Sequence, residues 1–332
     1  MRALDEIGRS DRAGRGVGAV AIESLQRFGS GLNRPECVLL TRRGAVYVSD
    51  HRGGVTAITP DGRGRLLGAG AMQPNGIALQ RDGSFLIANM GTGGGVWRMT
   101  AGPGPSQSAP LVTEVDSRPL ASVNFVLVDA RDRVWFSVSS LDAAAGRYDS
   151  RCVDGYIATV DAGVARIVAD GLCWTNEFRI DAAGDRLYVN ETFARRLTSF
   201  RIDATGSLSD RRTVAEFGAG VFPDGLALDA EGGAWIASII SNRVIRVAPD
   251  GSQEIVLEDP AADLEAYERA YQANTLSRDQ LGTAHGARLK NISSINFGGP
   301  DLRTVYLGSL GGETLETFRS PVAGQPQAHW LW

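Results

Sequence analysis

Cysteine, histidine and long apolar runs are scarce in this chain, and each scarcity excludes a class of protein. The 332 residues include only three cysteines, an odd number without metal-type spacing, so a disulfide framework is not expected. The three histidines, His51, His285 and His329, lie far apart, which argues against a multi-histidine zinc site. No run of about 18 apolar residues is present, which excludes a helical membrane span.

An excess of positive charge is also missing. The formal net charge is -4 and the pI is about 5.5, so nothing favours nucleic acid or an anionic membrane surface as a partner. Residues 1–17 carry charges but lack the apolar core of a signal peptide. We therefore expect a reduced, cytoplasmic protein that acts on a small molecule, with a homodimer left open.

Glycine, in contrast, is abundant, with 41 residues, and much of it lies in turns of a repeated pattern. In residues 222–238, Asp224 precedes an apolar run, a turn of Asp, Glu and Gly follows, and a second apolar run contains Trp235. Because Gly supplies the positive φ that tight turns require, the two runs are predicted to form an antiparallel hairpin. Five further segments share this pattern: 34–50, 74–89, 123–137, 175–190 and 292–308.

The spacing inside these hairpins is constant. Eleven residues separate the members of five equivalent pairs: Glu36 and Tyr47, Asn75 and Leu86, Asn124 and Trp135, Asn176 and Leu187, Asp224 and Trp235. Repeats of about 40–50 residues with four short strands are typical of propeller blades. The sequence thus predicts an all-β, six-bladed propeller with four-stranded antiparallel blades, over residues 18–332 after a mobile extension at 1–17. A β-sandwich with accidentally similar hairpins is the alternative.

Two segments depart from the repeat. An insertion at 260–289 contains good helix formers at 263–272, which predicts a helix. It could form a lid over one face, a dimer contact or a solvated surface excursion. Near the end, residues 314–318 should form a strand, and together with a strand predicted at 19–28 this would close the ring from both termini.

Polar residues precede the innermost strand of every predicted blade, where they should meet at one mouth of the central channel. They are Glu36, Asn75, Asn124, Asn176, Asp224 and Ser293. Clustered carboxylates and amides with no Lys or Arg among them favour a bound cation, and hard oxygen donors favour Ca²⁺, Mg²⁺ or Mn²⁺. A polar plug of hydrogen-bonded amides and water is the alternative.

Four segments are distinctive: Arg-Pro-Glu at 34–36, Asn176 before an apolar strand, Phe-Pro-Asp-Gly at 222–225 and Phe-Gly-Gly-Pro-Asp at 297–301. In these segments the chain resembles the senescence marker protein/gluconolactonase/luciferin-regenerating enzyme family. The resemblance covers about residues 30–320 and implies a six-bladed propeller that holds one divalent ion and hydrolyses lactones. It also implies that Glu36, Asn176 and Asp224 are metal ligands and that Asn124 contacts water or substrate. Ca²⁺ is then favoured, with Zn²⁺, Mn²⁺ or Mg²⁺ as alternatives.

Departures from the family pattern bear on the substrate. Phe125 stands where the family has Asp, Glu177 where it has Gly, and Ser122 where it often has Arg. These changes suggest a pocket less suited to sugars. An acid that often follows the blade 3 Asn corresponds to Asp142.

The leading hypothesis is metal-assisted hydrolysis of a lactone, with Asp224 as general base and Asn124 orienting water or substrate. Asn75, Glu177 and Asp142 are further candidates around the mouth, and His285 could reach it after the insertion. Isomerisation, hydration or another ring opening on the same scaffold is an alternative. A non-enzymatic binding propeller is another, because this fold hosts many functions.

Overall fold

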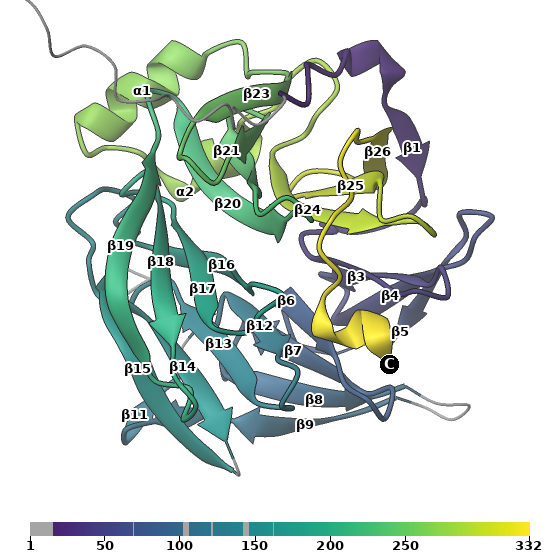
Figure 1. Ribbon diagram of the computed structural model, residues 1–332, viewed down its shortest axis with the longest axis vertical. Coiled ribbons are helices and arrows are strands. Elements are labelled where there is room, and N and C mark those ends of the chain that lie inside the picture. The colour runs from purple at the N-terminus through teal and green to yellow at the C-terminus, as the bar shows by residue number, and fades with distance from the viewer. Residues whose placement is uncertain (1–15, 69, 102–105, 121, 142–145, 162) are drawn as a thin grey trace, which may run out of the picture.

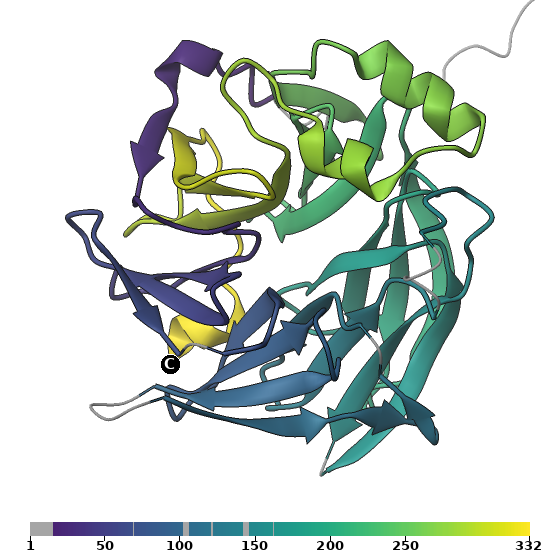
Figure 2. The same ribbon diagram turned by 180° about the vertical axis from the view of Figure 1, so that it is seen from behind.

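Six four-stranded antiparallel sheets are arranged in a ring around a common axis (Figures 1 and 2). The computed structural model describes residues 16–68, 70–101, 106–120, 122–141, 146–161 and 163–332. This confirms the predicted six-bladed propeller. Most of the extension predicted at 1–17 lies outside the described residues.

The first three blades follow the chain from the channel outward. Blade 1 contains β2 (Val38–Leu40), β3 (Val46–Asp50), β4 (Gly54–Ile58) and β5 (Gly64–Leu67). Blade 2 contains β6 (Pro74–Leu79), β7 (Phe85–Asn89), β8 (Val96–Thr100) and β9 (Gln107–Val112). A small hairpin of β10 (Glu114–Val115) and β11 (Arg118–Pro119) precedes blade 3, which contains β12 (Phe125–Val128), β13 (Val134–Val138), β14 (Gly155–Asp161) and β15 (Val164–Leu172).

The remaining blades complete the ring. Blade 4 contains β16 (Thr175–Ile180), β17 (Arg186–Glu191), β18 (Arg196–Ile202) and β19 (Leu208–Glu216). Blade 5 contains β20 (Val221–Leu228), β21 (Ala234–Ile240), β22 (Arg243–Val247) and β23 (Gln253–Glu258). Blade 6 contains β24 (Ile292–Gly298), β25 (Thr304–Ser309) and β26 (Leu315–Arg319), with β1 (Gln26–Phe28) from the other end of the chain as its outermost strand.

Both termini therefore contribute to blade 6, as predicted, but the N-terminal strand is shorter than expected. Only Gln26–Phe28 pairs with β26, and the 3-10 helix η1 (Ile22–Ser24) precedes it. The prediction of one strand over 19–28 was wrong because the earlier residues bind a different blade. Val17 N–H donates to Glu254 at 2.8 Å, and Val20 N–H donates to Val256 O at 2.6 Å, both on β23.

The hairpin pattern seen in the sequence has a simple physical basis in blades 3 and 5. The turn acid accepts a hydrogen bond from the indole six residues later: Asp129 from Trp135 at 3.0 Å and Asp229 from Trp235 at 2.9 Å. Each of these acids also forms an ion pair with a buried arginine. Large indoles can therefore be buried between blades with their N–H groups satisfied.

The insertion forms two helices, α1 (Leu264–Gln272) and α2 (Arg278–Thr283), in front of the blades in Figure 2. Helix α1 coincides with the predicted helical segment. It is fixed by Arg195, whose guanidinium forms two hydrogen bonds to Glu268, at 2.6 and 3.0 Å, and lies 3.8 Å from the Tyr271 ring centroid. The insertion is thus docked on the propeller. No helix in the described parts of the chain is long and apolar enough to cross a membrane.

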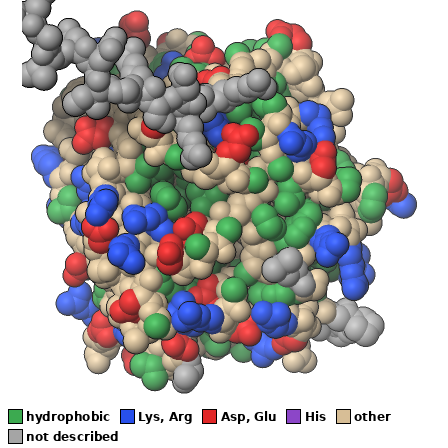
Figure 3. Space-filling view, viewed as in Figure 1, with side chains coloured by type: hydrophobic (Ala, Val, Ile, Leu, Met, Phe, Trp, Pro, Cys, Tyr) green, Lys and Arg blue, Asp and Glu red, His purple; other side chains and the backbone are tan. Residues whose placement is uncertain are grey.

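Residues 320–332, which we call the C-terminal strap, cross the end of the channel where the innermost strands finish (Figure 1). Gln325 N–H donates to Leu228 O at 2.8 Å, its amide donates to Ile180 O at 3.0 Å, and His329 Nε2 donates to Leu40 O at 3.0 Å. The strap ends in the 3-10 helix η3 (Ala328–Leu331). It therefore ties blades 1, 4 and 5 together. Acidic and basic side chains are intermixed on this face of the molecule (Figure 3).

The strap should contribute measurably to stability through Gln325. We expect Gln325→Ala to lower the free energy of unfolding by about 1–2 kcal/mol, because Ile180 O loses its donor. Denaturant unfolding measures the change. The control Gln107→Ala, on an exposed strand, should stay within about 0.5 kcal/mol of the parent. Equal effects of the two substitutions would show that the strap does not stabilise the ring.

Candidate functional site

Bulges in the innermost strands bring the predicted polar residues to the channel mouth. The register of β6, β16 and β20 with the next strand shifts between Pro74 and Ile77, between Thr175 and Phe178, and between Pro223 and Leu226. Each shift encloses one of the predicted polar positions. A bulge inserts an extra residue and re-aims side chains, so these positions can point into the channel while their neighbours pack in the blade.

A cavity of about 610 Å³ opens at this mouth. Of the residues predicted for the site, Glu36, Asn124, Asn176 and Asp224 line it, and all four are buried. Asn75 is also buried beside them, and its amide donates to Asn124 O at 2.9 Å. Four blades thus contribute polar side chains to one cavity of a size suited to a small molecule.

A guanidinium group at the mouth was not anticipated from the sequence. Arg34 Nη1 lies 2.7 Å from Glu36 Oε2 and 2.6 Å from His51 Nε2, and Arg34 and His51 both line the cavity. The premise that no cation stands among the polar residues was therefore wrong. Arg34 precedes the strand by several residues, so the pattern of residues immediately before each strand did not include it.

Backbone strain marks the same cavity independently. Arg34 and Trp174 both line it, and both adopt left-handed backbone conformations, with φ of 50° and 56°. Each stands two residues before a predicted ligand, Glu36 and Asn176 respectively. Such conformations cost about 1–3 kcal/mol and concentrate at functional sites.

The rest of the cavity wall is largely apolar. Tyr148, Trp174 and Phe193 form one aromatic group, with centroids 5.0–5.7 Å apart. Helix α2 adds Leu281 and Gly282 to the lining. The insertion therefore forms part of the cavity wall. Further apolar residues lining the cavity are Met90, Leu141, Ile239 and Leu310.

Phe125 and Glu177, two departures from the family pattern, both contact the side chain of Arg179. Arg179 Nη2 donates to Glu177 Oε2 at 3.0 Å, and its guanidinium carbon lies 4.7 Å from the Phe125 ring centroid. Glu177 also accepts from Leu226 N–H at 3.0 Å. Glu177 is buried and does not line the cavity, so in this structure it acts as a support within the propeller.

Burial dominates the electrostatics of the acidic residues. It raises the pKa of Glu36, an effect that Arg34 partly offsets. It raises the pKa of Asp224 well above the usual range, and the negative charges of Glu36 and Glu177 add to the shift. Burial also raises the pKa of Glu177 to about 7, against the opposing charge of Arg179. Burial therefore disfavours the charged forms of these carboxylates unless a cation lies beside them.

This donor set fits a hard divalent cation. Glu36 Oε2 accepts no hydrogen bond despite the nearby guanidinium, and the buried Asn124 Oδ1 is also without a donor among the described residues. In the same parts of the chain, no group of three His, Cys, Asp or Glu residues could hold a metal ion. A site here must therefore combine the carboxylates of Glu36 and Asp224 with the amide oxygen of Asn176, a composition typical of Ca²⁺.

Two other predicted residues are not brought into the cavity. His285 is exposed, does not line the cavity, and pairs through its backbone with Lys290. Asp142 lies outside the described residues.

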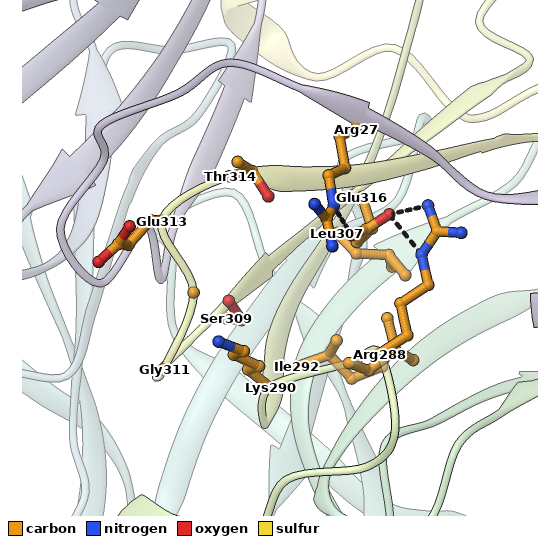
Figure 4. A pocket seen from close by; sticks show the side chains of 12 residues that line it. Arg27, Arg288, Lys290, Ile292, Leu307, Ser309, Gly311, Glu313, Thr314 and Glu316 are labelled. Atoms are coloured by element: carbon orange, nitrogen blue, oxygen red, sulfur yellow. Dashed lines mark hydrogen bonds and ion pairs between the residues drawn. The ribbon is translucent and has the colours of Figure 1, made fainter.

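A second cavity, of about 240 Å³, lies near Lys290 between blade 6 and the insertion (Figure 4). Three of its charged residues are already paired, since Glu316 forms ion pairs with Arg27 at 3.4 Å and with Arg288 at 2.7 Å. None of the predicted site residues lines it.

Comparison with known proteins agrees with this geometry. The sequence model described as "SMP-30/Gluconolactonase/LRE-like region" matches residues 35–263, well over half of the chain. The chain belongs to this family.

Individual relatives include both enzymes and a calcium-binding protein. Pentonolactonase XacC of Haloferax volcanii is 28% identical over 72% of this chain and 67% of its own length. The gluconolactonase XC5397 of Xanthomonas campestris superposes with a TM-score of 0.67 at 20% identity, covering 90% of this chain and 89% of its own. Regucalcin of Agrobacterium tumefaciens, a calcium-binding protein, superposes with a TM-score of 0.65 at 17% sequence identity. This match covers 91% of this chain and 94% of the regucalcin chain. At these identities the structural matches establish the fold.

The raised pKa of Glu177 predicts how the free energy of unfolding of the metal-free protein, kept in the presence of a chelator, depends on pH. Its pKa is about 7 in the folded chain against 4.5 as the ordinary value, so the folded state binds the proton more tightly. Stability should therefore fall as pH rises from about 4.5 to 7, with Glu177 contributing up to about 1.4 kcal/mol per pH unit. Denaturant unfolding across this range should show a flatter slope for Glu177→Gln.

The exposed Glu265 on α1 provides the control, since Glu265→Gln should keep the parental slope. A parental slope in Glu177→Gln would contradict the assignment.

Proposed function

We propose that this protein is a divalent-metal-dependent hydrolase that opens a lactone or related cyclic ester. The observation that carries the proposal is the convergence of Glu36, Asn176 and Asp224 on one cavity at the channel mouth. Membership of the family and the lactonases among its relatives support this reaction class. Calcium binding by one structural neighbour supports Ca²⁺ as the ion.

Glu36, Asn176 and Asp224 would hold the ion. When bound, a divalent ion polarises a carbonyl group and stabilises the negative charge that develops on its oxygen. Asp224 takes a proton from the attacking water as a general base, and returns it to the ring oxygen when the acyl–oxygen bond of the lactone breaks. Asn124 Oδ1, which lacks a donor among the described residues, accepts a hydrogen bond from that water or from the substrate.

The cavity wall bears on the kind of lactone. A sugar lactone presents hydroxyl groups that need hydrogen-bond partners, whereas Trp174, Phe193 and Leu281 offer apolar surface. Ser122 lines the cavity at the position where the family often has Arg. The substrate we propose is therefore less polar than a sugar lactone, with an apolar body that packs against the aromatic group.

Hydrolysis should require both the ion and Asp224. We expect chelation to abolish the opening of apolar γ- or δ-lactones and Ca²⁺ to restore it. Asp224→Asn should lower kcat/KM by about 100-fold or more, because it removes both a ligand charge and the base. Asp185→Asn, at an exposed hairpin turn, should have no effect. Near-ultraviolet circular dichroism checks that each variant is folded.

Product mass separates hydrolysis from the alternatives. A ring-opened product that is heavier by one water supports the proposal, and a product of unchanged mass identifies an isomerase. Activity that survives both chelation and Asp224→Asn would contradict the proposed mechanism.

A further inference from the structure

Helix α2 brings a second arginine to the cavity. Arg278, its first residue, lines the cavity and has no hydrogen-bond or ion-pair partner among the residues that the structure describes. Its charge is close enough to affect two other lining residues, His51 of blade 1 and Tyr148 of blade 3. Arg278 therefore shares this cavity with side chains of two different blades.

The backbone that carries Arg278 is held in place. Ser277 and Gln280 form a capping box, in which the Ser277 hydroxyl accepts from Gln280 N–H and the Gln280 side chain accepts from Ser277 N–H at 2.9 Å. After the helix, the Asn242 amide donates to Ala284 O at 3.1 Å. The backbone of Arg278 is therefore held at the cavity wall, and its exposed side chain is available to a ligand.

Among the described residues that line the cavity, no acidic side chain is paired with Arg278. Arg34 is already paired with Glu36 at 2.7 Å. Burial, reinforced by the charge of Arg34, lowers the pKa of His51 to about 4, so this ring is neutral at pH 7. With a divalent ion offsetting the two carboxylates Glu36 and Asp224, the positive charge of the two arginines remains. A ligand that complements the loaded cavity is therefore an anion.

Apolar side chains line the same cavity as Arg278 and the acidic residues. Tyr148 and Trp174 pack edge to face with centroids 5.0 Å apart, and Leu281 follows Arg278 by one turn of α2. A ligand that spans the cavity must therefore have an apolar middle.

We propose that Arg278 is a specificity-determining residue that binds an anionic group at the far end of the substrate. The substrate class is a lactone whose apolar body carries a carboxylate remote from the ring. The reaction in this statement rests on the proposed function, whereas recognition of the anion does not. The ion pair formed is the charge-assisted kind that guanidinium and carboxylate favour.

Binding without turnover tests the recognition step. The probes are 4-phenylbutyrate and 4-phenylbutyramide, which share one apolar body and differ in charge. Tryptophan fluorescence or calorimetry on the calcium-loaded protein measures the two dissociation constants. We expect the carboxylate to bind about 10-fold more tightly than the amide, and Arg278→Gln to remove this preference.

Arg269→Gln is the matched control, because Arg269 lies on α1, is exposed and does not line the cavity. It should keep the preference for the carboxylate. Equal binding of the two probes by the parent protein would overturn the proposal. A preference that persists in Arg278→Gln would also overturn it, because the anion would then be bound by another group, such as the ion.

A second measurement separates this inference from the proposed reaction. Two γ-lactones, one with a remote carboxylate and one with the matching carboxamide, are compared by kcat/KM. Arg278→Gln should lower the value about 10-fold for the carboxylate only. If neither lactone is opened while the binding preference depends on Arg278, the proposed reaction fails and the anion site stands.

Discussion

The burial of two carboxylates at the mouth of the channel is the constraint on which the rest of the site depends. Glu36 and Asp224 are each about 95% removed from solvent, and burial raises the pKa of both. An isolated buried charge is costly, so it must be neutralised by protonation, by a cation or by hydrogen bonds. Arg34 meets part of this need, and the divalent ion that we propose would meet the rest.

The scaffold makes this arrangement rigid. Strands from both ends of the chain close blade 6, and the C-terminal strap binds the strand ends at the opposite side of the channel. The insertion is anchored by Arg195 and Glu268, so α2 stands at a fixed place on the cavity wall. Side chains held by separate blades keep their positions because each blade is packed against two neighbours.

The sequence predicted the repeat well because five of the six hairpins share the same spacing. The eleven-residue step reflects one strand, one turn and a paired strand, and it identified Asn176 and Asp224 as equivalent positions. Arg34 and Arg278 could not be found in this way, since neither occupies the position equivalent to Asn176 and Asp224. Arg34 has a left-handed backbone conformation, and Arg278 lies on an inserted helix. The contact between the Phe125 ring and the Arg179 guanidinium could not be predicted either, because the two residues lie 54 positions apart in the chain.

The central claim is that one divalent ion binds Glu36, Asn176 and Asp224. Anomalous diffraction from crystals soaked in Mn²⁺ tests it most directly. The account predicts a single strong peak at the channel mouth, within about 2.0–2.6 Å of an oxygen from each of the three side chains, with Arg34 withdrawn from Glu36. No peak at this place, with Arg34 still paired to Glu36, would contradict it.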